Sequence, residues 1–166
     1  MSTSPQTMSS AIDGRPIAQR RSAIARPAIV RTALYLGALA VLATGVVHIQ
    51  QYYGNDYSSV PTIGTLFFLN FVSAVVLAAG LIAPLGRVAG RWADSIRALF
   101  AVGGIGFAVL SLVALFVSES SSLFNFSENG YRTAIVLAIV AEAAAAVFLL
   151  IFLVAAGTGL RRKAQK

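Results

Sequence analysis

One acidic residue, Glu142, lies in the middle of the last long apolar stretch of the chain, TAIVLAIVAEAAAAVFLLIFLVAAG. Insertion scales place an acid at the centre of a membrane helix at a cost of roughly 2.5 to 3.5 kcal/mol. Such a side chain must therefore be protonated, paired, or directed at a wet cavity. Three roles remain open for it: a neutral, hydrogen-bonded structural group, a carrier of protons or cations, and a contact with a partner subunit.

Two further polar residues, Asn70 and His48, lie inside other apolar stretches. At about 1.5 Å of rise per residue, Glu142 and Asn70 lie roughly 4 Å outward of the midpoints of their helices, and His48 lies roughly 10 Å outward. We therefore predict that the three form a polar cluster in the outer half of the membrane. Taken singly, Asn70 suits a hydrogen bond between helices, and His48 suits solvation by water and headgroups.

Motifs for catalysis and metal binding are absent from the sequence. There is one His and no Cys, no Gly-rich phosphate loop follows a strand, and no acid and base stand at nucleophile spacing. A metal site would need Glu142, Asp56 or backbone groups besides His48. We therefore expect no catalytic residues, no metal site and no cofactor, and we do not expect an enzyme.

The elements that must position these residues are membrane helices. The chain has 166 residues, of which 57% are hydrophobic and 11% charged, whereas soluble domains average about 25% charged. Four apolar runs are each long enough to cross a hydrocarbon core of about 30 Å as a helix. A transmembrane barrel would show shorter segments of alternating polarity. The predicted fold class is all-α, a bundle of four transmembrane helices.

The predicted boundaries divide the chain into two tails and one membrane domain. We expect a disordered basic tail over residues 1–30, interrupted by Pro5, Pro16 and Pro27. A cleaved signal peptide is less well supported, because the first apolar run exceeds the usual length of a signal core. The membrane domain covers 31–157, and a second basic tail covers 158–166. The four predicted helices cover 32–50, 61–83, 96–117 and 133–156.

The basic residues are distributed unevenly along the chain. The two tails and the loop between the second and third helices carry 12 Lys or Arg, and the other two loops carry one. The positive-inside rule then predicts that both termini and the middle loop are cytoplasmic. The charge suits a membrane surface better than nucleic acid. The residues expected to contact anionic lipid headgroups are Arg20, Arg21, Arg26, Arg31, Arg87, Arg91, Arg97, Arg161, Arg162 and Lys163.

The first loop and the start of the second helix are rich in aromatic residues. Tyr52, Tyr53 and Tyr57, with Asp56, are expected near the outer membrane surface, and Trp92 near the inner one. The stretch from His48 through Pro61-Thr-Ile-Gly64 to Asn70 resembles a pattern in small four-span bacterial membrane proteins. This resemblance covers about a quarter of the chain and implies no activity. It groups His48, Tyr52 and Asn70 as one outer feature.

Small residues recur at helical spacing on three of the predicted helices, which indicates close contacts between helices. These stripes are Gly37, Ala40, Thr44 and His48; Gly104, Ala108 and Ser111; and Ala134, Ala138, Glu142 and Ala145 or Ala146. Glu142 is therefore expected to point into the bundle or at a partner rather than at lipid.

The leading functional interpretation is an accessory or interaction protein of the cytoplasmic membrane. The richness in Ala, Val and Gly is typical of bacterial proteins. The alternative is a small transporter or proton-coupled component that uses Glu142 with Asn70 and His48. Because four helices are few for a transport pathway, that alternative predicts a homo-oligomer or a larger membrane complex.

Overall fold

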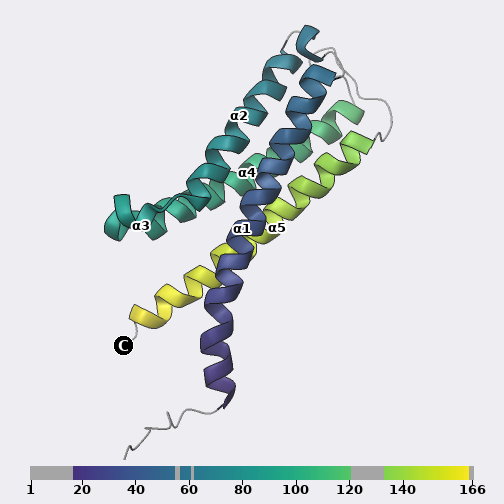
Figure 1. Ribbon diagram of the computed structural model, residues 1–166. Coiled ribbons are helices and arrows are strands. Elements are labelled where there is room, and N and C mark those ends of the chain that lie inside the picture. The colour runs from purple at the N-terminus through teal and green to yellow at the C-terminus, as the bar shows by residue number, and fades with distance from the viewer. Residues whose placement is uncertain (1–16, 55–56, 61, 121–132, 165–166) are drawn as a thin grey trace, which may run out of the picture.

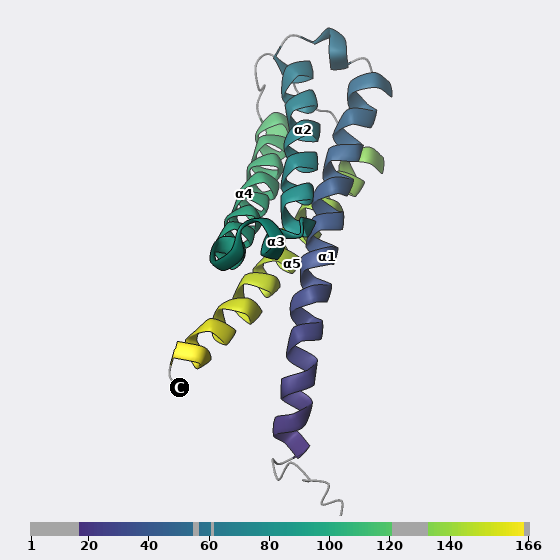
Figure 2. The same ribbon diagram turned by 60° about the vertical axis from the view of Figure 1, so that its left-hand side comes forward.

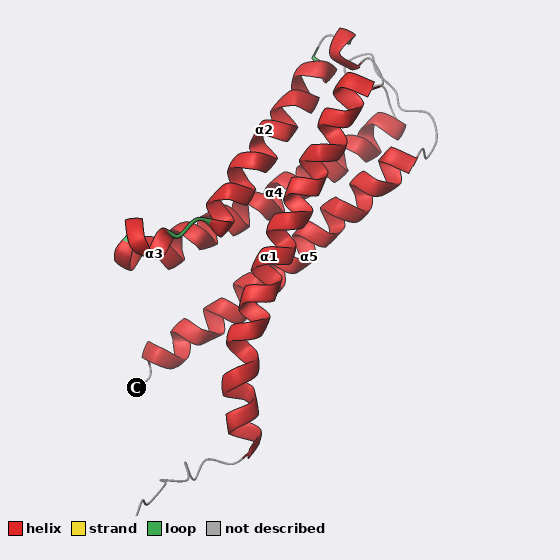
Figure 3. Ribbon diagram, in the orientation of Figure 1, coloured by secondary structure: helices red, strands yellow, loops and turns green. Residues whose placement is uncertain are grey.

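The computed structural model describes residues 17–54, 57–60, 62–120 and 133–164, and within them every regular element is helical (Figure 3). In chain order the elements are α1 (Ile17–Gly54), η1 (Tyr57–Ser59), α2 (Ile63–Ile82), α3 (Leu85–Val88), η2 (Gly90–Trp92), α4 (Ala93–Ser120) and α5 (Thr133–Ala164). The start of α1, the short helix α3 and the end of α5 lie toward one end of the bundle, and η1 lies at the other (Figure 1).

Four of these helices contain segments long and apolar enough to cross a membrane: Pro27–Gly54, Ile63–Ile82, Gly90–Ser118 and Thr133–Gly157. The predicted all-α bundle with four spanning helices is confirmed to this extent. Large apolar side chains such as Leu39, Leu99, Val140 and Leu150 are exposed on the outside of the bundle. That arrangement suits a multi-pass membrane protein, whose outer face meets lipid.

Three of the elements differ from their predicted limits. The first helix begins at Ile17 rather than Thr32, and Pro27 lies inside it. The last helix continues to Ala164, eight residues past Ala156. The loop after α2 contains α3 and η2 rather than irregular chain. Arg and Ala are strong helix formers, and they let a helix continue beyond the apolar run that marks the membrane. Residues 1–16 of the predicted tail lie outside the described residues.

The four spanning helices are arranged as a ring. Neighbours around the ring are α1 and α2, α2 and α4, α4 and α5, and α5 and α1, and α1 barely touches α4 across it. Figure 2 shows α2 between α4 and α1, with α5 behind them. Of these four contacts, the one between α2 and α4 is the least extensive.

Small residues let α1 approach both of its neighbours closely. A Cβ atom built on Gly45 would lie 2.6 Å from the Cβ of Ala74 in α2, and one built on Gly37 would lie 2.6 Å from Cδ2 of Leu149 in α5. Leu149 also fills the space beside Gly104 of α4. Gly37 and Gly104, which belong to the predicted stripes of α1 and α4, therefore lie at contacts between helices.

At the end of the bundle that holds α3, an arginine joins α2 to α4. Arg97, near the start of α4, donates from Nε to the Leu81 carbonyl at 3.3 Å and from Nη2 to the Ala83 carbonyl at 3.1 Å. The last carbonyls of a helix have no partner within it, and a cation there also suits the helix dipole. Arg97, which we expected at lipid headgroups, thus directs its guanidinium at the end of α2.

Candidate functional site

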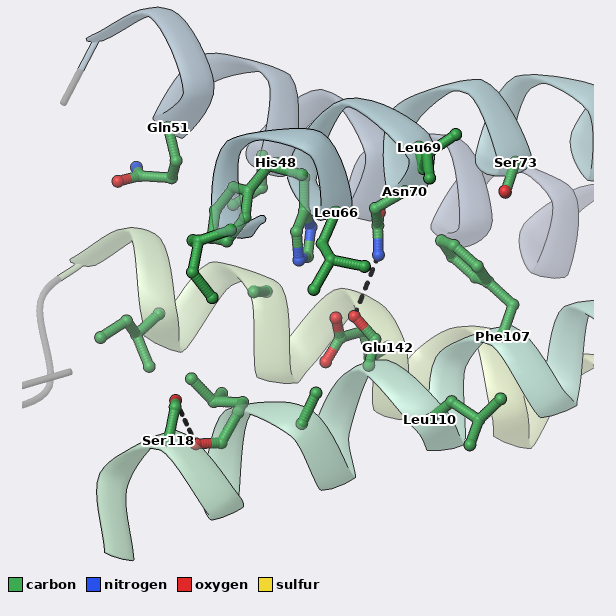
Figure 4. A pocket seen from close by; sticks show the side chains of 18 of the residues that line it. His48, Gln51, Leu66, Leu69, Asn70, Ser73, Phe107, Leu110, Ser118 and Glu142 are labelled. Atoms are coloured by element: carbon green, nitrogen blue, oxygen red, sulfur yellow. Dashed lines mark hydrogen bonds between the residues drawn. The ribbon is translucent and has the colours of Figure 1, made fainter. Parts of the chain in front are cut away.

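A cavity of about 360 Å³ lies among the four spanning helices, in the half of the bundle nearer η1. Figure 4 shows the side chains that line it. All four helices contribute polar residues to its wall, among them His48 from α1, Asn70 from α2, Ser111 from α4 and Glu142 from α5. The structure therefore brings together the three residues of the predicted cluster, although they are up to 94 positions apart in the chain. That this cluster is functional stays a prediction.

Glu142 is buried inside the monomer, with 1% of its surface exposed. It lies on the same face of α5 as Ala138 and Ala145, which are also buried, so the predicted stripe faces the bundle. One carboxyl oxygen, Oε2, is buried without a hydrogen-bond partner. The carboxyl group therefore points neither at lipid nor at an outer surface where a partner subunit could dock.

The hydroxyl of Ser111 connects Asn70 to Glu142. Asn70 donates from Nδ2 to Ser111 Oγ at 3.1 Å, and a dashed line marks this bond in Figure 4. The Ser111 side chain in turn lies beside the Glu142 carboxyl group. Because Nδ2 is the donor in this bond, the amide oxygen Oδ1 of Asn70 remains, and it is buried without a partner. Two buried oxygens, one amide and one carboxyl, are thus unpaired in a single site.

His48 of α1 is another polar residue of the wall. Its Nδ1 lies 2.9 Å from the Thr44 carbonyl oxygen, which can only accept, so Nδ1 carries the proton in this bond. In a neutral imidazole Nε2 is then an acceptor. The ring packs against Phe67, with 5.0 Å between the ring centroids. It lies on the same side of the cavity as Asn70 (Figure 4).

The rest of the wall is mainly apolar. Its largest side chains come from α2, α4 and α5, and they are Leu66, Phe67, Leu69, Phe107, Leu110, Leu115 and Ile135. Among the described residues, no Lys or Arg lines the cavity, and no cluster of three or more metal-ligating side chains occurs. A charged Glu142 carboxylate would therefore find no counter-charge in this wall.

The wall of the cavity reaches the outer face of the bundle at α2 and α4, and we infer that the cavity opens sideways between these helices. Leu69 on α2 and Leu110 on α4 both line it, yet 51% and 70% of their surfaces are exposed. Both residues lie well inside segments that can span a membrane. This opening therefore faces the same apolar surroundings as the outside of the bundle.

The predicted aromatic feature lies beside the cavity rather than in its wall. Tyr52 stacks edge-on against Tyr53, with 4.8 Å between ring centroids, and also lies 6.0 Å from Phe68. Neither tyrosine lines the cavity. Tyr57 belongs to η1, and Asp56 lies outside the described residues.

The predicted lipid-contacting residues lie away from this site. Arg31, Arg87 and Arg91 are exposed, and the Arg91 guanidinium lies 5.4 Å from the centre of the Trp92 ring. The others occur in the terminal parts of α1 and α5, and they are Arg20, Arg21, Arg26, Arg161, Arg162 and Lys163.

Sequence reasoning missed the central role of Ser111, which it treated only as part of a small-residue stripe. It also missed Gln51, Ser73 and Ser118, which line the cavity. The available signal was the stripe itself: Ser111 ends the sequence Gly104, Ala108, Ser111 on the face of α4 that meets the other helices.

The chain matches none of the protein-family models, curated proteins or solved structures with which it was compared. The geometry of the cavity is therefore the main indication of what the protein does.

Proposed function

We propose that this protein is a small transporter or proton-coupled component of the membrane, in which Glu142 exchanges a proton for a ligand held in the cavity. Asn70 and His48 orient that ligand, and Ser111 fixes the carboxyl and amide groups relative to each other. The role is one of binding and exchange rather than catalysis.

The observation that carries this proposal is the pair of unpaired oxygens, Asn70 Oδ1 and Glu142 Oε2, buried at one cavity. Buried polar groups are nearly always hydrogen-bonded, because an unsatisfied one costs about 1 to 3 kcal/mol. A carboxyl group inside a membrane span adds to that cost. A purely structural site would pair these atoms with each other or with neighbouring side chains. A ligand site instead leaves them available.

The accessory role receives less support from this geometry. In that interpretation Glu142 would contact a partner subunit, yet the side chain is 1% exposed within the monomer. Any partner would therefore have to bind elsewhere, on the exposed apolar faces of the helices.

The distribution of Lys and Arg along the chain supports an orientation in the membrane. We propose that both tails face the cytoplasm and that the protein resides in the plasma membrane, since the basic residues gather in the tails and the α2–α4 connection. We also propose a homo-oligomer, because four helices offer a narrow transport route. Tags on both tails should be reached by reagents from the same side only, and cross-linking in native membranes should trap multiples of one chain.

Infrared spectroscopy of the purified protein tests the exchange group. A buried carboxyl gives a protonated C=O stretch that is distinct from those of exposed acids. We expect this band in the wild type to respond to pH while the protein stays folded, and to be missing in Glu142→Gln. Glutamine is the matched control because it keeps the size and the hydrogen-bonding capacity of the side chain. A band that never changes with pH would contradict the proposed exchange.

A further inference from the structure

The unpaired oxygens at the cavity and one ring nitrogen beside them share one property: they can accept hydrogen bonds. Oε2 of an ionised Glu142 and Oδ1 of Asn70 are unpaired acceptors, and Nε2 of a neutral His48 is an acceptor as well, because Nδ1 donates to the Thr44 carbonyl. The donor group of Asn70 is already used on Ser111. A ligand that matches this set must supply N–H or O–H donors.

The charge of the site narrows the class of ligand further. Among the described residues that line the cavity, Glu142 is the one acid, and none is a Lys or an Arg. An ionised carboxylate at this depth therefore needs a counter-charge from the ligand. An ammonium group satisfies both demands at once, since it carries a positive charge and several donors.

The size and the walls of the cavity favour an organic cation over a metal ion. A volume of about 360 Å³ far exceeds that of a bare ion and falls within the range of small-molecule pockets. No group of three metal-ligating side chains occurs among the described residues. The leucine and phenylalanine walls instead suit an apolar body, and aromatic faces such as that of Phe67 also attract cations.

The position of the opening indicates how such a ligand reaches the site. The rim residues Leu69 and Leu110 are exposed on the lateral face of the bundle, inside spanning segments. A hydrophobic amine concentrates in the bilayer with its ammonium group near the headgroups. Its apolar body therefore lies in the hydrocarbon, as the rim between α2 and α4 does, and the ammonium group leaves the headgroup region only to meet the Glu142 carboxylate.

We propose that the cavity binds a hydrophobic amine in its ammonium form, which enters from the bilayer between α2 and α4. This inference rests on the proposed function and names its substrate class. The ammonium group contacts Glu142, Asn70 and His48, while the apolar body lies against the leucine and phenylalanine walls.

The test compares three probes of one shape, adamantylamine, adamantanol and adamantane carboxylate, on the full chain in lipid nanodiscs. Equilibrium dialysis against empty nanodiscs corrects for partitioning into lipid. Near neutral pH the amine is an ammonium ion, like the side chain of lysine. We expect the amine to bind about tenfold to a hundredfold more tightly than the alcohol, because a charge-assisted contact replaces a neutral one. The carboxylate should not bind above the blank. Equal binding of amine and alcohol, or no saturable binding, would overturn the proposal.

Two substitutions locate the binding. In Glu142→Gln the preference for the amine should disappear, so that amine and alcohol bind alike. In Leu110→Trp the indole should fill the rim and abolish saturable binding. Leu99→Trp is the matched control, because Leu99 also lies on α4 and is equally exposed, at 70%, but does not line the cavity. If Leu110→Trp does not fold, Leu69→Trp tests the same rim from α2. Unchanged amine binding in the rim variant would refute the lateral route.

Different results would refute the proposed substrate class and the proposed exchange role of Glu142. If the amine shows no preference while the Glu142 carboxyl band still responds to pH, the substrate class is wrong and the exchange role stands. If the band does not respond and no probe saturates, the proposed function itself is wrong.

Discussion

The contacts that α2 makes with α1 and with α4 differ in kind. Between α1 and α2, Gly45 and Ala74 bring the backbones together, and no space remains for even a methyl group. Between α2 and α4, the contact is less extensive and depends on polar bonds, from Arg97 at one end and from Asn70 to Ser111 farther along. The close contact fixes the shape of the bundle, whereas the looser one leaves room for the cavity.

The largest effect should come from breaking the close contact. In Gly45→Leu the new side chain would collide with Ala74 and with the Phe71 backbone, whose Cα lies 3.4 Å from the position of a Cβ on Gly45. We expect a loss of about 3 kcal/mol or more in unfolding free energy, at the upper end of the cost of overpacking. Unfolding in a denaturing detergent measures this loss.

The matched control for Gly45 is Gly106→Leu in α4, where a Cβ would meet nothing within 4 Å. Leucine favours a helix over glycine by somewhat less than about 1 kcal/mol, so this variant should keep or raise the stability. If both glycine variants lose stability equally, the contrast between the two contacts is wrong.

A smaller effect is expected from removing the polar link at the end of α2. Arg97→Met keeps an unbranched apolar stem but leaves the Leu81 and Ala83 carbonyls without their donor. We expect a loss of about 1 to 2 kcal/mol in the same unfolding assay, because hydrogen bonds that involve a charged group are stronger than neutral ones. Arg91→Met, at an exposed position, should change the stability little. An Arg97 variant as stable as the Arg91 variant would contradict this assignment.

The bond from Asn70 to Ser111 should contribute less still. A double-mutant cycle with Asn70→Ala and Ser111→Ala should give a coupling free energy of about 0.6 kcal/mol, the average for such bonds between membrane helices. A coupling near zero would show that the two side chains do not act together, and Glu142 would then lack its fixed neighbour.

The smallest effect on stability is expected for Glu142→Leu, which also tests the proposed function. Leucine removes a buried carboxyl oxygen that has no partner and leaves Asn70 bonded to Ser111. We therefore expect the unfolding free energy to stay unchanged or to rise, while amine binding is lost. A large loss of stability would instead assign Glu142 a structural role.

The four spans could be predicted because each requires only a long apolar run, and a run is visible in the sequence. The grouping of His48, Asn70 and Glu142 followed from their similar depths. The role of Ser111 could not be predicted, because it depends on which helices are neighbours and on how α4 is rotated. The early start of α1 was missed because Pro27 was expected to interrupt a helix, whereas a proline in a helix removes one hydrogen bond and need not end it.

The hydrogen bonds from Arg97 to the end of α2 limit how α2 and α4 can move apart. The guanidinium ties α4 to the carbonyl end of α2 at one extremity of the pair, while the gap beside Leu69 and Leu110 lies far from that tie. If the gap widens to admit a bulky ligand, the bond from Asn70 to Ser111 beside it must break, and α2 and α4 then separate about the end that Arg97 holds. A small rotation about Arg97 would therefore move the far ends of the two helices, the start of α2 and the end of α4, by a larger distance.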